Sequence, residues 1–406
     1  MKHIILLGDG MADHPLEELG KRTPLQAAST PYMDQMARMG RLGLAVTVPP
    51  GMSPGSDVAN LSVMGYDPSR FYSGRAPLEA AAMGVELGKE DIAFRCNLVT
   101  VRDCVMEDYS AGHISSEEGA ELIVALRPLI PAGRIHAGVS YRNLLVLNEG
   151  ADAKCTPPHD ITGRQIQDYL PRGRGAAKLR EIMEEARPIL ESHKVNLRRI
   201  ARGKRPANMI WLWGQGKAPS IPSFEKLHNI TGAVISAVDL IKGIGRYAGL
   251  EVVNVAGATG TIDTDYEGKV EAALDALGRH DFVFLHVEAP DEAAHEGNLL
   301  LKVKAIEEFD HRIVGPVLEG LRKAGQPYRA CVLPDHPTPI ETKTHSSEPV
   351  PFAMMGEGIE PDGISRFDEA SAREGGFGVV NGPDVMELLL NGPPGSPPRI
   401  SKSEEE

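Results

Sequence analysis

Several common signatures are missing from this 406-residue sequence, and each absence excludes a class of protein. Apolar runs such as residues 4–7 and 282–285 are far shorter than the about 20 residues that a membrane-spanning helix needs. The first of these runs ends at Gly8, which argues against a signal peptide. The four cysteines show no CxxC spacing, so reduced thiols are expected. We therefore expect a cytoplasmic protein that does not enter a membrane.

Motifs for nucleotides and for one type of zinc site are also missing. No GxxxxGK[ST] occurs, which argues against a P-loop kinase, and no HExxH occurs. Gly243 and Gly245 lack the third glycine of a dinucleotide-binding fingerprint. The net charge of −13 argues against nucleic acid or an anionic membrane as partner. It does not exclude a phosphorylated substrate, because bound cations would set the sign of the field in a cleft.

Apolar strand patterns alternate with amphipathic helix patterns in the first and last parts of the chain. Such an alternation predicts an α/β fold whose mostly parallel sheet has helices on both faces. The predicted strands are residues 3–7, 42–48, 251–256, 281–287, 329–333 and 350–355. The predicted helices are residues 31–39, 232–248, 266–277, 299–323 and 385–390.

The middle of the chain has its own strand and helix patterns, so we expect a second, smaller α/β domain inserted into the first. Its predicted strands are residues 91–101 and 141–147, and its predicted helices are residues 115–126 and 174–200. This gives a discontinuous core at 1–88 and 222–392 and an inserted domain at 89–221. Residues 393–406, rich in Pro, Gly, Ser and then Glu, are expected to be disordered.

Carboxylates and imidazoles follow several of the predicted strands. Asp9, Asp291 and Asp335 each come soon after one, and open α/β sheets bind ligands at the carboxyl ends of their strands. The imidazoles of the set are His295, His336 and His345. Three carboxylates and three imidazoles can hold two divalent cations, which suits phosphoryl transfer. Any one of these residues alone is more simply explained as an ion pair or a packed polar group; the repeated placement after strands carries the hypothesis.

Ser56 completes the set. It lies in the sequence PGSDVAN, where Gly55 permits a tight turn and a helix could follow. Taken alone, a serine here is most simply a helix N-cap. Beside two cations, its hydroxyl could act as a nucleophile.

The motifs together resemble a known family. They are LLGDGMAD, PGSDVANLSVMGYDP, SGRAPLEAAAMGV, WGQGKAPSIPSF, ISAVDLIKGIG, EAPDEAAHEGN, LPDHPTP and THSSEPVPF, spread from residue 5 to about 352. In order and spacing they are similar to the archaeal type of cofactor-independent phosphoglycerate mutases, within the alkaline phosphatase superfamily.

The resemblance implies a metal-binding α/β core with an inserted substrate-binding cap. One metal would be held by Asp291, His295 and His345, and the other by Asp9, Asp335, His336 and the nucleophile Ser56. Mn²⁺ is the first expectation, with Co²⁺, Zn²⁺ and Mg²⁺ left open. The substrate-binding candidates are His113, Arg142, His159, Asp160 and Lys217 in the cap, and Arg75 and Lys242 in the core.

The activity that the resemblance implies is the interconversion of 3-phosphoglycerate and 2-phosphoglycerate, in glycolysis and gluconeogenesis, without 2,3-bisphosphoglycerate. Ser56 would carry the phosphoryl group, and Asp160 or His113 would serve as acid or base for the glycerate hydroxyls. The alternatives are a phosphatase or a kinase for a small alcohol such as homoserine, and a metal-binding scaffold without activity. The sequence leaves the oligomeric state open.

Overall fold

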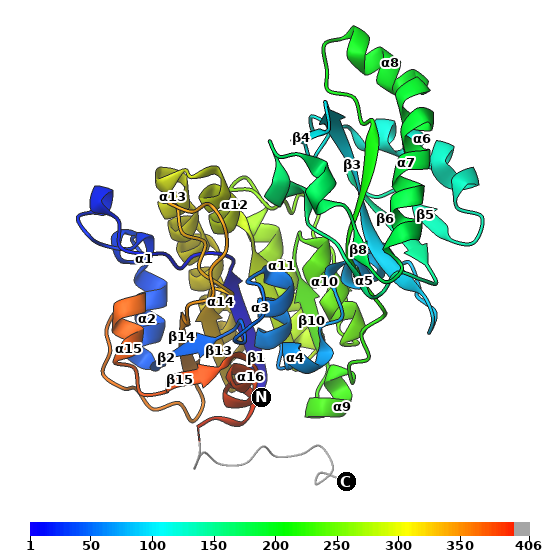
Figure 1. The fold of residues 1–406 in the computed structure, drawn as a ribbon. Helices are drawn as coiled ribbons and strands as arrows, with labels where there is room; N and C mark the ends of the chain where they lie inside the picture. Colours follow the sequence, from blue (N-terminus) through cyan, green and yellow to red (C-terminus); the bar gives the residue numbers. More distant parts are fainter. Residues whose placement is uncertain (394–406) are drawn as a thin grey trace. The chain divides into compact units, whose positions relative to one another are not determined.

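The computed structural model describes residues 1–393, and the predicted tail at 393–406 lies outside them except for Pro393. The described chain forms two compact units: unit 1 comprises Met1–Tyr72 and the residues from Ile221 onward, and unit 2 comprises Ser73–Ser220 (Figure 1). Within residues 1–393, no helix has the length and apolar character needed to cross a bilayer.

Unit 1 is built on an eight-stranded sheet. The strands, in spatial order, are β11 (Glu251–Val253), β10 (Gly232–Ile235), β12 (Phe282–Val287), β1 (Lys2–Gly8), β13 (Tyr328–Leu333), β14 (Val350–Gly356), β2 (Arg41–Val46) and β15 (Gly378–Asn381). Only β14 runs against its neighbours; every other pairing among these strands is parallel. The predicted fold class, a mostly parallel sheet with helices on both faces, is confirmed.

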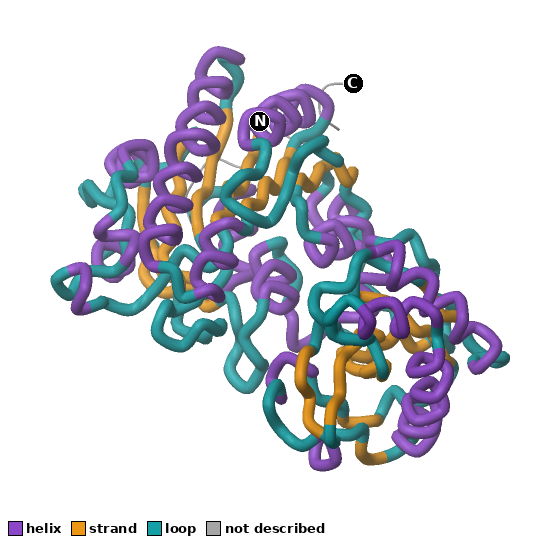
Figure 2. The backbone as a smooth tube through the Cα atoms, turned by 90° about the horizontal axis from the view of Figure 1, so that it is seen from above, coloured by secondary structure: helices purple, strands orange, loops and turns teal. Residues whose placement is uncertain are grey.

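Helices cover both faces of this sheet because alternate side chains of its strands point to opposite faces (Figure 2). Ile4 and Leu6 of β1 share one buried cluster with residues of α2 (Pro31–Met39), α11 (Tyr266–Arg279), α13 (Leu299–Phe309) and α14 (Gly315–Ala324). The other face packs against α3 (Ser56–Val63), α10 (Asp239–Tyr247) and α16 (Gly382–Asn391).

Two of the predicted helices differ in the structure. The predicted helix at 232–248 is wrong in its first part: Gly232–Ile235 is the buried strand β10, and only Asp239–Tyr247 is helical. A short apolar run has no periodicity that separates a strand from a helix, which explains the error. The predicted helix at 299–323 is helical throughout, with a π-helical turn at Asp310–Val314 before Pro316.

Unit 2 contains a smaller antiparallel sheet. Its long strand β3 (Ile92–Arg102) pairs with β6 (Arg142–Leu147) and β4 (Val105–Asp108), and also with β9 (Met209–Gly216). Strand β5 (Arg134–His136) pairs with β6. Helices α6 (Ser116–Leu126) and α7 (Ala176–Ser192) pack on the sheet through Leu122, Ile123 and Leu179.

The structure corrects two details of the predicted insertion. Residues 73–88 belong to unit 2 rather than to the core, because Ala76 and Ala80 of α5 (Arg75–Ala82) pack against Ala93 and Leu144. The predicted helix at 174–200 is interrupted at His193, where the backbone is extended. The His193 side chain accepts a hydrogen bond from the backbone N–H of Val195 and so caps a new helix, α8 (Lys194–Ala201).

Candidate metal and phosphoryl-transfer site

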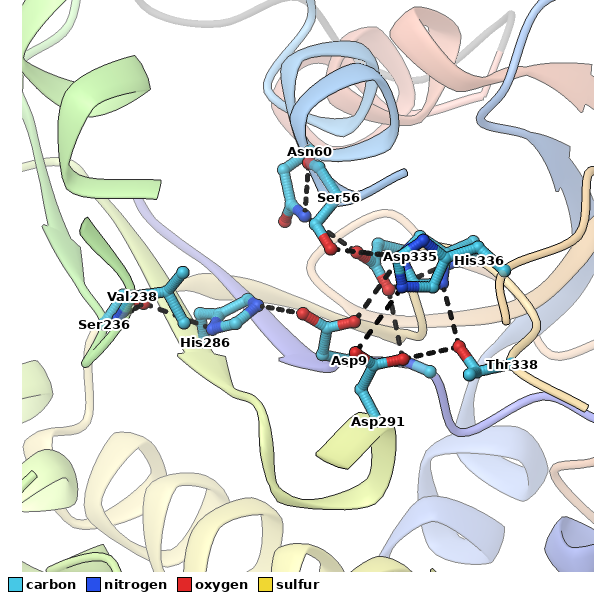
Figure 3. A network of polar contacts seen from close by, with 12 residues as sticks. Asp9, Ser56, Asn60, Ser236, Val238, His286, Asp291, Asp335, His336 and Thr338 are labelled. Carbon is cyan, nitrogen blue, oxygen red and sulfur yellow. Dashed lines mark hydrogen bonds and ion pairs between the residues drawn. The ribbon is translucent and has the colours of Figure 1, made fainter. Parts of the chain in front are cut away.

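The carboxylates predicted from strand ends lie together in unit 1. Asp9 follows β1, and Asp335 lies two residues after the neighbouring β13. Asp291 lies in the first turn of α12 (Ala289–Glu296), the helix that follows β12 on the other side of β1. All three side chains are almost completely buried. Parallel strands end at the same edge of a sheet, which explains why residues more than 300 positions apart in sequence meet here (Figure 3).

Asp291, His295 and His345 form the first candidate metal group. Oδ2 of Asp291 lies 3.0 Å from Nε2 of His295 and 3.6 Å from Nε2 of His345. The two imidazole Nε2 atoms are 3.0 Å apart. Asp291 and His295 are four residues apart on α12, so both side chains project from one face of that helix.

The Nε2 atom of the His295 ring faces Oδ2 of Asp291 and Nε2 of His345, and the other ring nitrogen determines its protonation. Its Nδ1 lies 3.0 Å from the carbonyl oxygen of Lys343, to which it can only donate a hydrogen bond. In the neutral ring the lone pair is therefore on Nε2, the atom that faces Asp291 and His345. Although burial acts in the opposite direction, the hydrogen bond that protonated His295 donates to Asp291 raises the pKa of His295 to about 9. Either a proton or a metal cation can occupy this position.

Asp9, Asp291 and His336 form the second candidate group, and Asp335 borders it. Nε2 of His336 lies 3.6 Å from Oδ1 of Asp9 and 3.2 Å from Oδ2 of Asp335. Asp291 thus belongs to both groups, whereas the sequence assigned it to one metal only.

Thr338 connects the two groups. Its hydroxyl donates to Oδ1 of Asp291 at 2.5 Å, and its oxygen lies 3.2 Å from Nδ1 of His336. Because the only hydrogen of that hydroxyl points to Asp291, its oxygen accepts the Nδ1 hydrogen of His336. The lone pair of His336 is then on Nε2, which faces Asp9 and Asp335.

Ser56 is the first residue of α3, and its hydroxyl oxygen lies 3.1 Å from Nε2 of His336. Asn60, one turn further along the helix, donates to Oδ2 of Asp335 at 2.8 Å and to the backbone carbonyl of Ser56 at 2.9 Å. Asn60 therefore ties the start of α3 to the carboxylate at the end of β13. The arrangement leaves the Ser56 hydroxyl directed at the acidic cluster (Figure 3).

Unbalanced negative charge in this cluster fits divalent cations. Burial, followed by the charges of Asp335 and Asp291, raises the pKa of Asp9 well above its usual range. Oδ1 of Asp9 and Oδ1 of Asn60 are buried and have no hydrogen-bond partner among the described residues. Buried polar atoms normally have partners. Carboxylate oxygens and imidazole nitrogens that converge in this way are ligands that Mn²⁺, Zn²⁺ and similar cations accept.

Gly10 allows the loop after β1 to approach this cluster closely. Its backbone has a φ of +64°, and a Cβ built on it would lie 2.5 Å from Oδ1 of Asp291. Its N–H donates to Oδ1 of Asp335 at 3.2 Å. A side chain at position 10 would therefore collide with one acidic residue while its backbone supports another.

Three of the predicted substrate residues gather within unit 2. The ring of Tyr141 has Arg142 above it at 5.2 Å and the His113 ring at its edge, with centroids 6.3 Å apart. His159 packs against Trp213, with ring centroids 5.3 Å apart, and against Tyr109, which itself contacts Tyr141. The aromatic cluster of Tyr109, Tyr141 and Trp213 therefore joins His113, Arg142 and His159.

A second basic group adjoins the same aromatic cluster. The buried Arg95 guanidinium lies 4.4 Å from the centroid of the Trp213 ring. Glu79 pairs with Arg95 at 3.0 Å through one oxygen and with Arg75 at 3.2 Å through the other. Arg75 is thus linked to the cluster through Glu79. It lies in unit 2 and not in the core, because it belongs to α5.

His113 stands on an unusual turn. Ala111, Gly112 and His113 have φ values of 51°, 64° and 47°. Left-handed backbone costs about 1–2 kcal/mol for each residue other than glycine. Asp108 accepts hydrogen bonds from the N–H groups of Ser110 and Gly112 and so supports this turn. Strained backbone of this kind is concentrated at functional sites.

The remaining predicted substrate residues are placed separately. Lys217 is half exposed and pairs with Glu90 at 3.4 Å. Asp160 lies 3.6 Å from the neighbouring His159 ring, and burial raises the pKa of its carboxyl group. Lys242, on α10 of unit 1, pairs with Asp239 at 3.8 Å.

Four residues of these clusters were missed by sequence reasoning. Asn60, His286, Thr338 and Arg95 each contact a predicted site residue or its cluster. His286 had a usable signal, since it is the only polar residue of the buried strand FVFLHV. Thr338 and Asn60 lie in quoted motifs but have ordinary side chains. Their roles depend on contacts across elements.

Comparisons with known proteins agree with the resemblance seen in the sequence. Residues 37–196 match a family described as 2,3-bisphosphoglycerate-independent phosphoglycerate mutase. A relative of that name from Methanothrix thermoacetophila is 62% identical over 392 residues, covering 97% of this chain and all of the relative.

Two solved structures extend the likeness to the fold. A cofactor-independent phosphoglycerate mutase from Thermoplasma acidophilum has a TM-score of 0.64 at 32% identity, covering 96% of this chain and 99% of its own. A Pyrococcus horikoshii protein has a TM-score of 0.81 at 31% identity, covering 96% of each chain. The chain therefore belongs to the enzyme family of 2,3-bisphosphoglycerate-independent phosphoglycerate mutases.

Proposed function

We propose that this protein interconverts 3-phosphoglycerate and 2-phosphoglycerate, as a step of glycolysis and gluconeogenesis, through a phosphoserine formed on Ser56. The observation that carries the proposal is the position of the Ser56 hydroxyl, 3.1 Å from Nε2 of His336 and directed at two groups of metal-binding side chains. The activity for which the relatives are named supports phosphoglycerate as the substrate.

The two groups are proposed to hold two divalent cations, Mn²⁺ first among the candidates. Asp291, His295 and His345 would hold one. Asp9, Asp335, His336 and Ser56 would hold the other, with Asp291 also able to bridge. Such cations, when bound, stabilise negative charge on the attacking, leaving and phosphoryl oxygens of an in-line displacement.

The residues of this chain account for the remaining steps. Oγ of Ser56 would react as its alkoxide, forming a bond to phosphorus as the bond from phosphorus to the glycerate oxygen breaks, and the same alkoxide would be released at the end of each cycle. That oxygen takes up a proton, and the other glycerate hydroxyl later gives up a proton when it takes the phosphoryl group back. His113 or Asp160 is proposed to carry these protons, so that no proton is gained or lost over the cycle.

Unit 2 is proposed to hold glycerate as a substrate-binding cap. Its basic side chains Arg75, Arg95 and Arg142, near the aromatic cluster, offer guanidinium groups that bind carboxylate or phosphate. Lys217 and Lys242 are further candidates for these anions. Retention of glycerate beside phosphoserine is what separates a mutase from a phosphatase, because water would otherwise take the phosphoryl group.

The Ser56→Ala variant tests the proposal. It should fold and bind metal but isomerise phosphoglycerate below about 1% of the wild-type rate, since loss of a nucleophile costs several orders of magnitude. Isomerisation and phosphate release are measured in parallel, with Mn²⁺ added after chelation and without 2,3-bisphosphoglycerate.

Ser62→Ala is the matched control. Ser62 is a fully buried serine of the same helix, and its hydroxyl has no hydrogen-bond partner among the described residues. This variant should keep nearly full activity. If Ser56→Ala isomerises phosphoglycerate as fast as the control, Ser56 is not the nucleophile. If the wild type releases phosphate without isomerising phosphoglycerate, the protein is a phosphatase instead.

A further inference from the structure

His286 is a completely buried histidine that belongs to neither candidate metal group. It is the only polar residue of β12, whose other residues are Phe, Val and Leu. An imidazole in such a strand is costly unless both of its nitrogens have partners. Both partners are present, and they lie on the two strands that flank β12.

Nε2 of His286 lies 2.9 Å from Oδ2 of Asp9, and Nδ1 lies 3.2 Å from the hydroxyl oxygen of Ser236. Ser236 directly follows β10, and Asp9 directly follows β1. The three residues therefore form a row across the adjacent strands β10, β12 and β1 (Figure 3).

The hydrogen atoms of this row can be placed. Oδ2 of an ionised Asp9 can only accept, so Nε2 of His286 carries the hydrogen; Nδ1 then accepts from the Ser236 hydroxyl, whose oxygen itself accepts from the N–H of Val238 at 2.9 Å. In the neutral ring the proton is then on Nε2, so His286 donates to Asp9. Burial keeps the ring neutral, since it lowers the pKa of His286 to about 3.

This donation occupies one oxygen of Asp9 and directs the other into the cluster. Oδ1, the oxygen that His286 does not contact, lies 3.6 Å from Nε2 of His336 and is buried without a hydrogen-bond partner in residues 1–393. Rotation of the carboxylate would break the bond to His286. The ligand atom of Asp9 is therefore fixed before any cation arrives.

We propose that His286, held in one tautomer by Ser236, is a positioning residue that orients Asp9 for the second cation. The inference deepens the proposed function and rests on its metal site. Partners of this kind, bonded to a metal ligand, typically contribute about 10–100-fold to metal affinity.

The test is Mn²⁺ binding to the full chain, measured by equilibrium dialysis without substrate. His286→Leu should weaken one of the two Mn²⁺ sites by about 10–100-fold and leave the other near its wild-type affinity. His286→Gln should recover much of the loss, because its amide nitrogen can occupy the position of Nε2. Ser236→Ala should weaken Mn²⁺ binding less, because it removes only the hydrogen bond that fixes the tautomer of His286.

His3→Leu is the matched control. His3 is a second buried histidine of the same sheet, at the start of β1, where its Nδ1 lies 3.3 Å from the carbonyl oxygen of Asp281. This variant should shift the melting temperature of the metal-free protein but not the Mn²⁺ affinity. A loss of affinity equal to that of His286→Leu would show a general effect of buried histidines and overturn the proposal.

The other outcomes are also decisive. Wild-type affinity at both sites in His286→Leu would overturn the positioning role. If that variant does not fold, wild-type affinity at both sites in Ser236→Ala would overturn it equally. A wild type that binds two Mn²⁺ without forming phosphoserine would refute the proposed function alone, whereas one that binds no Mn²⁺ would refute both.

Discussion

The sheets of the two units differ in strand direction, and their candidate residues differ accordingly. In unit 1, seven strands run in the same direction, so Asp9, Asp335 and the start of α12 meet at a single edge. In unit 2 the strands are antiparallel, and successive strand ends lie at opposite edges. Three of its candidate residues, His113, Arg142 and His159, gather instead around the packed rings of Tyr109, Tyr141 and Trp213.

The two units also differ in how firmly their candidate side chains are held, and this indicates which kind of ligand each unit suits. The carboxylates of unit 1 are buried, and each is held by its own hydrogen bond, Asp9 by His286, Asp291 by Thr338 and Asp335 by Asn60. Those residues suit cations, which require fixed ligand atoms. In unit 2, Arg142 and Lys217 are exposed at the ends of long side chains, which suits an organic anion that must be admitted, turned and released.

The largest expected effect comes from breaking the unit 1 site. Asp335→Asn should lower the isomerisation rate by at least about 1000-fold, because even outer partners of metal ligands contribute about 10–100-fold. Metal analysis after dialysis should show one Mn²⁺ fewer per chain. Asp275→Asn, at an exposed position of α11, is the control and should bind two Mn²⁺. Full occupancy in Asp335→Asn would remove this residue from the ligand set.

A substitution in unit 2 should weaken substrate binding and leave metal binding unchanged. Arg142→Ala should raise the KM for 3-phosphoglycerate by about 10–100-fold, since a hydrogen bond to a charged group contributes about 1.5–3 kcal/mol. The Mn²⁺ affinity should stay as in the wild type. Arg134→Ala, which removes an exposed arginine paired with Asp91 in the same sheet, should leave KM unchanged. A loss of metal binding in Arg142→Ala would contradict the division of labour between the units.

The smallest effect is a dependence of metal affinity on pH. Metal-free His295 has a pKa raised to about 9, so it holds a proton on Nε2 at neutral pH, and a cation must displace that proton. From pH 8 to pH 9 the apparent Mn²⁺ affinity of this site should rise by up to about tenfold. Titration calorimetry in two buffers should show proton release on binding. Affinity independent of pH would contradict the protonated state of His295.

The same shift affects the stability of the metal-free protein in the opposite direction. Because the pKa of His295 is raised in the folded state, its pair with Asp291 stabilises the fold fully below its ordinary pKa of 6.5. That stabilisation is lost as pH rises through about 9. Thermal unfolding of the metal-free protein across this window would measure it.

Strand ends made most of the unit 1 site predictable. An apolar strand followed by Asp9 or by Asp335 is a local pattern, and the rule for parallel sheets brings such patterns together. His286 is not among the predicted site residues, because a histidine within an apolar strand is most simply explained as a packed core residue. Its contacts depend on Ser236, fifty residues away, which no local pattern indicates.

Unit 2 was less predictable for a physical reason. Its boundary was placed at 88 instead of 72, because the apolar side of α5 does not reveal which sheet it covers. Unit 1 has one comparable error: a helix is predicted at β10, because a four-residue buried strand has no period of its own. Arg95 was missed because its position over Trp213 depends on pairing between β3 and β9.

Covalent trapping tests the central claim, phosphoryl transfer through Ser56, most directly. The metal-loaded wild type is mixed with 3-phosphoglycerate carrying a radiolabelled phosphate, quenched in acid within the first turnover, digested and sequenced by mass spectrometry. The account predicts label on Ser56, dependent on Mn²⁺ and absent from Ser56→Ala, while Ser62→Ala is labelled like the wild type. Label on another residue, or isomerisation at full rate with no labelled protein, would contradict it.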